Sequence, residues 1–139
     1  MQQHHASFTV STRRGLTDIT DKVREALRDS GLRTGLCTIY IRHTSASLVI
    51  QENADPAVQR DLEAFLSRLV RDGDPLFTHT AEGDDDMPSH VKAAMTRTSE
   101  QVPFADGALR LGTWQGIYLW EHRTAPHRRE IVVHLLGEE

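Results

Sequence analysis

The sequence has a single cysteine, Cys37, among its 139 residues, so no disulfide bond can form within the chain. It also lacks any apolar stretch near the roughly 20 residues that a membrane-spanning helix needs. Its formal net charge is -4, and its 16 lysines and arginines are spread along the chain without forming the basic patch of a nucleic-acid-binding protein. We therefore expect a cytoplasmic protein that binds neither nucleic acid nor membrane.

What the chain does contain is enough for one folded domain, residues 1–139. Hydrophobic residues make up 38% of the sequence and charged residues 26%, which is typical of a protein with a packed core. There is no internal repeat and no low-complexity tract. His4 and His5 lie close to a chain end, so we expect residues 1–6 to be frayed and leave both histidines out of any site.

Alternation of apolar and polar residues predicts strands over residues 7–12, 36–43, 47–53, 100–104, 109–111, 113–122 and 130–136. Three helices are predicted between them. The first follows the capping residues 18–21 and ends at Gly31, and the third covers residues 88–95. This order predicts an α+β domain with largely antiparallel sheets packed with two or three helices.

The second helix has the clearest start, because Asp55 offers a capping side chain and Pro56 fits the first helical position. It should run to about residue 70. Its apolar residues recur at helical spacing, which predicts a buried face. That face consists of Val58, Leu62, Phe65, Leu66 and Leu69.

Residues 36–43 and 47–53 are joined by a short polar segment, which predicts an antiparallel hairpin. Alternation puts His43 at the end of one apolar stripe and Glu52 at the end of the other. A buried carboxylate needs a partner, because removing it from water costs several kcal/mol. His43 is a candidate partner across the hairpin. A structural His–Glu pair and a functional site are equally consistent with this pattern.

The segment 77–90 places His79 and His90 on either side of the acidic run Asp84–Asp86. Imidazoles with carboxylates suit zinc, manganese or iron, whereas carboxylates with phosphate oxygens suit magnesium, so the metal stays undecided. An alternative is that the acidic run only caps the following helix, whose macrodipole favours anions at that end. His79 would then be an ordinary surface residue.

The segment 113–123 repeats the pattern of aliphatic residues flanked by polar ones, with Gln115 and Glu121 on the same face of a strand. Glu121 is a candidate ligand or base, although a salt bridge to one of the nearby arginines is the more favoured single role. Those arginines and Lys92 can hold phosphate, but scattered basic residues usually only solvate a surface. The three arginines are Arg123, Arg128 and Arg129.

Five segments together resemble the YjbQ family, whose members are also labelled secondary thiamine-phosphate synthases. They are residues 43–47, 51–56, 83–90, 111–116 and 121–123. The resemblance implies a compact α+β protein, typically a homotrimer, with a metal-capable pocket. It also implies a secondary activity that joins a pyrimidine pyrophosphate to a thiazole phosphate and releases pyrophosphate. Many relatives carry asparagine where this chain has Asp86, which adds a carboxylate here.

The family's recurrent polar residues correspond to His43, Glu52, Asp55, His79, Asp85, His90, Gln115 and Glu121. In the synthase interpretation, His79 and His90 hold a divalent metal, zinc or magnesium. The catalytic residues are Glu52, Asp85, His43 and Glu121, and a phosphorylated small molecule is bound by Gln115, Lys92, Arg128 and Arg129. Two other functions stay open: a metal-dependent hydrolase of a phosphoester or amide, with Glu52 or Glu121 as base, and a non-enzymatic protein that binds a metal or small ligand.

Overall fold

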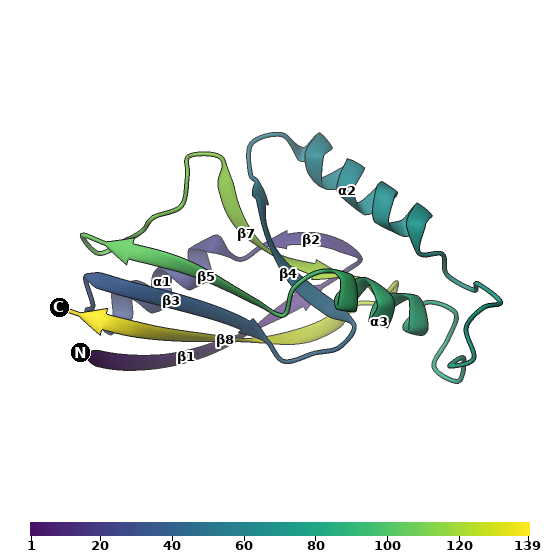
Figure 1. The fold of residues 1–139 in the computed structure, drawn as a ribbon, viewed down its shortest axis with the longest axis horizontal. Helices are drawn as coiled ribbons and strands as arrows, with labels where there is room; N and C mark the ends of the chain where they lie inside the picture. The colour runs from purple at the N-terminus through teal and green to yellow at the C-terminus, as the bar shows by residue number, and fades with distance from the viewer.

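The computed structural model describes residues 1–139, which form three helices and two antiparallel sheets (Figure 1). The five-stranded sheet has the order β1-β8-β3-β5-β6 and the three-stranded sheet the order β2-β7-β4. The elements are β1 Gln2–Thr12, β2 Gly15–Asp18, α1 Thr20–Ser30, β3 Thr34–Ile41, β4 Ala46–Glu52, α2 Pro56–Leu69, α3 Asp86–Met95, β5 Ser99–Ala105, β6 Ala108–Leu109, β7 Gln115–Glu121 and β8 His127–Glu138. The α+β architecture predicted from the sequence is confirmed.

The start of α2 and the end of α1 follow the predicted signals. The Asp55 side chain accepts a hydrogen bond from the backbone N–H of Ala57 at 2.9 Å, and Pro56 occupies the first turn of α2. Gly31 ends α1 with a φ of 71°, a left-handed conformation that costs glycine little. Local capping chemistry therefore sets these boundaries.

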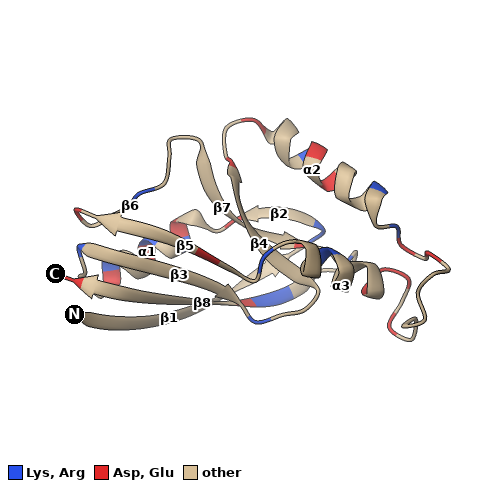
Figure 2. Ribbon diagram, in the orientation of Figure 1, with Lys and Arg blue, Asp and Glu red and all other residues tan.

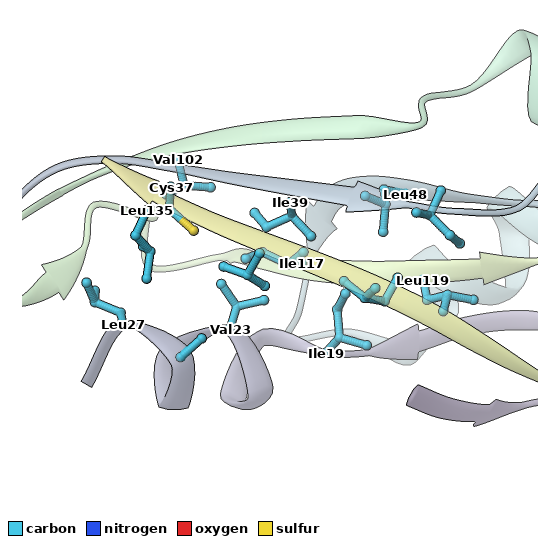
Figure 3. Close-up of a cluster of buried hydrophobic side chains, with 14 of the residues drawn as sticks. Ile19, Val23, Leu27, Cys37, Ile39, Leu48, Val102, Ile117, Leu119 and Leu135 are labelled. Carbon is cyan, nitrogen blue, oxygen red and sulfur yellow. The ribbon is translucent and has the colours of Figure 1, made fainter. Parts of the chain in front are cut away.

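The core lies between the two sheets and α1. In Figure 3, side chains from α1, β3 and β7 point toward one another, among them Val23, Ile39 and Ile117. Cys37 lies in this cluster and is fully buried, and burial raises the pKa of its thiol to about 12. The thiol is therefore a core group, as the alternation along β3 predicts.

The predicted hairpin is wrong. Strands β3 and β4 are consecutive in the chain but belong to different sheets, because β3 pairs with β5 and β8 while β4 pairs with β7. The polar segment between them carries the chain from one sheet to the other. Period-two alternation shows which face of a strand is buried and contains no information about the neighbouring strand.

Three further expectations are wrong: the frayed N-terminus, the start of α3 and the buried face of α2. Residues 1–6 are not frayed, because β1 pairs with β8 along its whole length, from Gln2 opposite Gly137 onward, which also places the two chain ends side by side (Figure 1). Helix α3 begins at Asp86, two residues earlier than predicted. On α2 only Leu66 is buried, whereas Phe65 is 66% and Leu69 56% exposed. The helix lies apart from the five-stranded sheet (Figure 1), and this chain covers only part of its apolar stripe, since Val58 and Leu62 are half-buried.

Candidate metal centre

One carboxylate oxygen of Asp86 lies between two imidazoles. Its Oδ2 atom is 2.8 Å from Nε2 of His79 and 3.2 Å from Nε2 of His90. Asp86 and His90 are one turn apart on α3, and the loop before the helix brings His79 back to the same point. The three ligand atoms lie within 4.8 Å of one another. The convergence of residues 79 and 90 expected from the sequence is therefore present.

The backbone fixes the tautomer of His90. Its Nδ1 atom is 2.9 Å from the carbonyl oxygen of Thr44, and because a carbonyl only accepts, Nδ1 carries the proton. In the neutral ring, Nε2 then presents a lone pair to the Asp86 carboxylate. Two acceptors in contact repel each other unless a cation lies between them. A metal ion or a second ring proton meets that requirement, and a backbone carbonyl on the far ring nitrogen is the usual arrangement around metal-bound histidine.

Arg123, just after β7, holds the acidic residues from the other side. Its Nη1 atom donates to Oδ1 of Asp86 at 2.8 Å, and its Nε atom donates to Oδ2 of Asp85 at 2.9 Å. Although burial opposes it, the hydrogen bonds from Arg123 and Thr124 lower the pKa of Asp85 below its ordinary value. For Asp86, burial is likewise outweighed by the contacts with His79 and the charge of Arg123, which lower its pKa.

Asp86, not Asp85, is therefore the carboxylate of the centre. The sequence interpretation gives Asp85 a catalytic role, and in the structure Asp85 accepts hydrogen bonds from Arg123 and from the backbone N–H of Thr124 and is not part of the cluster. The signal that separates them is helical spacing: His90 shares a face with the residue four positions earlier and not with the residue five earlier. The sequence offers Arg123 as a partner for Glu121 or as a phosphate-binding residue, and no sequence signal indicates its contacts with Asp85 and Asp86.

Glu82 was not singled out from the sequence, yet it lies at the open side of the centre. Its Oε2 atom is 3.7 Å from Nε2 of His79, and its side chain is exposed. A small cavity of about 110 Å³ lies beneath the same loop, with His79 in its wall. Figure 2 shows the acidic segments of this loop in red. Three protein ligands with one open side are the usual arrangement of a catalytic zinc site.

Glu121 is enclosed and fully bonded. Its Oε1 atom accepts from the Thr12 hydroxyl and from Nε of Arg129, the latter at 2.7 Å, and its Oε2 atom accepts from Arg129 and from the backbone N–H of Arg123. Burial is outweighed by these donors, Arg129 first, so the pKa of Glu121 is lowered. A carboxylate without a free lone pair is not a general base. The favoured salt-bridge interpretation is observed, with Arg129 as the partner.

Two predicted site residues lie at the far end of the three-stranded sheet. Glu52 pairs with Gln115, whereas Ala46 pairs with Glu121 six residues along the same two strands, about 20 Å away at the usual rise per residue. Glu52 accepts from the backbone N–H of Asp55 at 3.1 Å, and Gln115 accepts from the N–H of Gly112. Within one chain, neither residue reaches the centre, and Glu52 does not pair with His43.

The predicted phosphate-binding cations are also placed differently from expectation. Arg128 is exposed and donates to the Thr9 hydroxyl on β1. Lys92 is fully buried, and its Nζ has no hydrogen-bond partner. Burial, and next the charge of Arg14, lower its pKa. His122 is buried as well, and burial followed by the charge of Lys92 lowers its pKa to about 3. Lys92 is therefore closed off from any phosphate in solution.

Fold and site together define a class of protein: a small α+β domain of two antiparallel sheets with a His–Asp–His cluster formed by its third helix and the loop before that helix. The chain belongs to the YjbQ family, since the family model described as UPF0047 protein YjbQ-like matches residues 4–138. It is 49% identical to UPF0047 protein sll1880 of Synechocystis sp. over 99% of this chain and 94% of the relative. It is 42% identical to UPF0047 protein YjbQ of Escherichia coli O157:H7 over 97% of this chain and 99% of the relative.

Solved structures show the same fold. The hypothetical protein APE1520 from Aeropyrum pernix superposes with a TM-score of 0.88 at 34% identity, covering 97% of this chain and 99% of the other. A protein of unknown function from Sulfolobus solfataricus gives a TM-score of 0.87 at 28% identity, covering 99% of both chains. None of the three helices in this chain is both long enough and apolar enough to cross a membrane.

Proposed function

We propose that the protein binds one divalent metal ion through His79, Asp86 and His90 and acts on a small phosphorylated molecule there. The tautomer of His90 carries this proposal. With Nδ1 donating to Thr44, the Nε2 lone pair of the neutral ring and the Asp86 carboxylate face each other at 3.2 Å, and a metal ion bound to both would relieve their repulsion. Arg123 neutralises only the opposite oxygen of Asp86.

Zinc fits this set of donors better than magnesium. Imidazole is a common ligand of zinc, whereas magnesium prefers six oxygens and keeps much of its hydration shell. Two imidazole nitrogens and one carboxylate oxygen also match the ligand sets of catalytic zinc, which leave a fourth position open. We therefore take zinc as the resident ion.

The reaction proposed first is the one that the family resemblance implies, formation of thiamine phosphate from a pyrimidine pyrophosphate and a thiazole phosphate. A bound divalent ion supplies the charge that stabilises a departing pyrophosphate. The chain itself contributes the positions of the ligands, with Arg123 and Thr44 holding Asp86 and His90 in place. No protein nucleophile is required, since the thiazole nitrogen attacks the pyrimidine methylene.

Hydrolysis of a small phosphoester or amide is the second candidate, and the position of Glu82 favours it. A carboxylate 3.7 Å from His79 on the open side suits a general base. Release of pyrophosphate that depends on both thiamine precursors supports the synthase, and turnover of a single ester supports the hydrolase. Tight metal binding with turnover of neither would favour the third alternative, a metal-binding protein without catalysis.

The decisive measurement is the metal content of untagged protein, by elemental analysis after exhaustive dialysis against zinc. We expect about one zinc ion per chain in the wild type and none in the double variant His79→Ala, His90→Ala. The matched control is His5→Ala, His134→Ala, which removes a neighbouring pair of rings from the β1–β8 ladder instead. Equal zinc content in all three proteins would contradict the proposed ligands.

We also propose that the chain forms a homotrimer in the cytoplasm. Support for the assembly comes from α2, whose apolar stripe includes Phe65 at 66% and Leu69 at 56% exposure. Such a stripe on a helix surface marks a contact with another protein molecule. A single buried thiol with no disulfide partner is compatible with a reducing compartment.

A further inference from the structure

A second pair of polar side chains, His43 and Arg129, lies beside the proposed metal centre. Arg129 is only 4% exposed and projects from β8 on the inner side of the sheet. Its Nε and Nη2 atoms donate to Glu121, and Nη2 donates to Ser45 as well. Its Nη1 atom makes no hydrogen bond to an oxygen of the chain, and its one polar contact is with Nδ1 of His43 at 3.5 Å.

The tautomer of His43 follows from its other contact. The backbone N–H of Glu130 donates to Nε2 of His43 at 2.7 Å, and a backbone N–H can only donate. In the neutral ring the proton is therefore on Nδ1. A guanidinium nitrogen also only donates, so the 3.5 Å contact between Nδ1 and Arg129 Nη1 is not a hydrogen bond. Two donors face the same point with no acceptor between them.

An oxygen from solvent or from a bound ligand could accept from both donors. Donors that share no acceptor lose hydrogen-bond energy, and an oxygen within reach of both would restore it. The pair formed by His43 and Arg129 is connected to the proposed metal centre by Thr44. This residue follows His43 in the sequence and accepts the hydrogen bond from His90. The connection thus runs through the backbone of Thr44, which contacts the ring nitrogen of His90 that faces away from Asp86.

We propose that Nδ1 of His43 and Nη1 of Arg129 form an oxyanion subsite that binds a terminal phosphate group of the substrate. A phosphate offers several acceptor oxygens, so it can bind these two donors and a neighbouring cation at the same time. A carboxylate does this less readily. Its place next to a metal-dependent site rests on the proposed function. Phosphate binding by the two donors does not itself require the metal.

The test uses the full-length protein labelled with 15N, with inorganic phosphate as the probe and acetate as the comparison oxyanion. Proton–nitrogen correlation spectra of the histidine rings report the tautomer of His43 and its response to each anion, with and without zinc. We expect Nδ1 to carry the proton, and phosphate, but not acetate, to shift it saturably in both metal states.

Substitutions locate the binding. We expect His43→Phe and Arg129→Lys each to weaken phosphate binding about 10-fold, as the loss of one charge-assisted hydrogen bond implies. Arg129→Lys retains a positive charge opposite Glu121. In these variants the backbone amides around Ser45 report the binding. His43→Gln, which restores an acceptor for Glu130 and an N–H donor, should recover most of the affinity. The control Arg128→Ala removes an exposed neighbouring charge and should leave binding unchanged.

The result separates this subsite from the metal centre. The subsite is supported if the double variant His79→Ala, His90→Ala loses zinc and keeps the phosphate response, and the subsite then stands without the metal. It is overturned if the wild type gives no saturable response, if acetate binds as tightly, or if His43→Phe and Arg129→Lys bind like the wild type. It is also overturned if the phosphate response appears only with zinc and disappears with His79 and His90, since phosphate would then bind the metal alone.

Discussion

Arg123 and Asp86 are joined by a hydrogen bond of 2.8 Å from Nη1 to Oδ1, so the other carboxylate oxygen of Asp86 is left to face His79 and His90. The arginine follows β7 and the aspartate begins α3. A single side chain therefore connects the end of the small sheet to the start of α3, the helix that carries two of the three proposed ligands.

Removing that connection should destabilise the protein. We expect Arg123→Met to lower the free energy of unfolding by about 3 kcal/mol, because two mostly buried carboxylates lose their counter-ion. Urea unfolding followed by circular dichroism measures the change. The control is Arg24→Met, which breaks the exposed pair with Asp21 on α1 and should cost at most about 0.5 kcal/mol. Equal costs in the two variants would show that Arg123 does not anchor α3.

Lys92 should reduce the stability of the protein at neutral pH. Burial lowers its pKa, so between that lowered value and the ordinary value of 10.5 the unfolded chain binds more protons and wild-type stability rises with pH. We expect Lys92→Met to be more stable than the wild type by about 1–2 kcal/mol at pH 7, with the gap closing toward about pH 10. Chemical unfolding across this range tests it. Lys22→Met, on the exposed face of α1, should show no such trend.

Glu121 should prove structural. Glu121→Gln leaves the buried Arg129 without a full counter-ion, and we expect a loss of about 3–5 kcal/mol in unfolding free energy. The double variant Glu121→Leu, Arg129→Met removes both charges and should recover a large part of that loss. A Glu121→Gln protein with wild-type stability and no turnover would instead restore Glu121 as a catalytic base.

The exposed stripe of α2 gives a prediction about assembly. Phe65→Asp places a charge in that stripe and should shift the protein from trimer to monomer in size-exclusion chromatography with light scattering. Ala64→Asp adds the same charge about 100° around the helix and should leave the assembly intact. A wild-type chain that is monomeric at all concentrations would contradict the proposed trimer.

Local rules predicted much of the fold. Caps and glycine placed the ends of α1 and α2, and alternation identified the buried face of β3. Sheet membership was beyond reach, because β4 alternates in the same way whether it pairs with β3 or with β7. The face of the strand predicted for Glu52 was therefore plausible, but the neighbouring strand predicted for it was wrong.

The residues of the candidate site were likewise predictable only where local spacing along the chain determines their position. His79 and His90 were found because a short acidic loop limits how far apart its ends can lie. The choice between Asp85 and Asp86 depended on where α3 begins, and a start two residues earlier than predicted put Asp86 in phase with His90. Arg123 and Glu82 act through tertiary contacts that no spacing along the chain reports.

The pairing of Gln2 with Gly137 has a practical consequence for engineering. Arg129 is eight residues before Gly137 on β8, or about 26 Å at the usual strand rise. A fluorophore or affinity handle attached at either terminus thus lies at the opposite end of the molecule from the proposed metal ligands (Figure 1). A short peptide bridging the two ends would close the chain into a ring and allow new termini in the loop before α3, making that loop accessible to selection or labelling while the strand pairing of both sheets is retained.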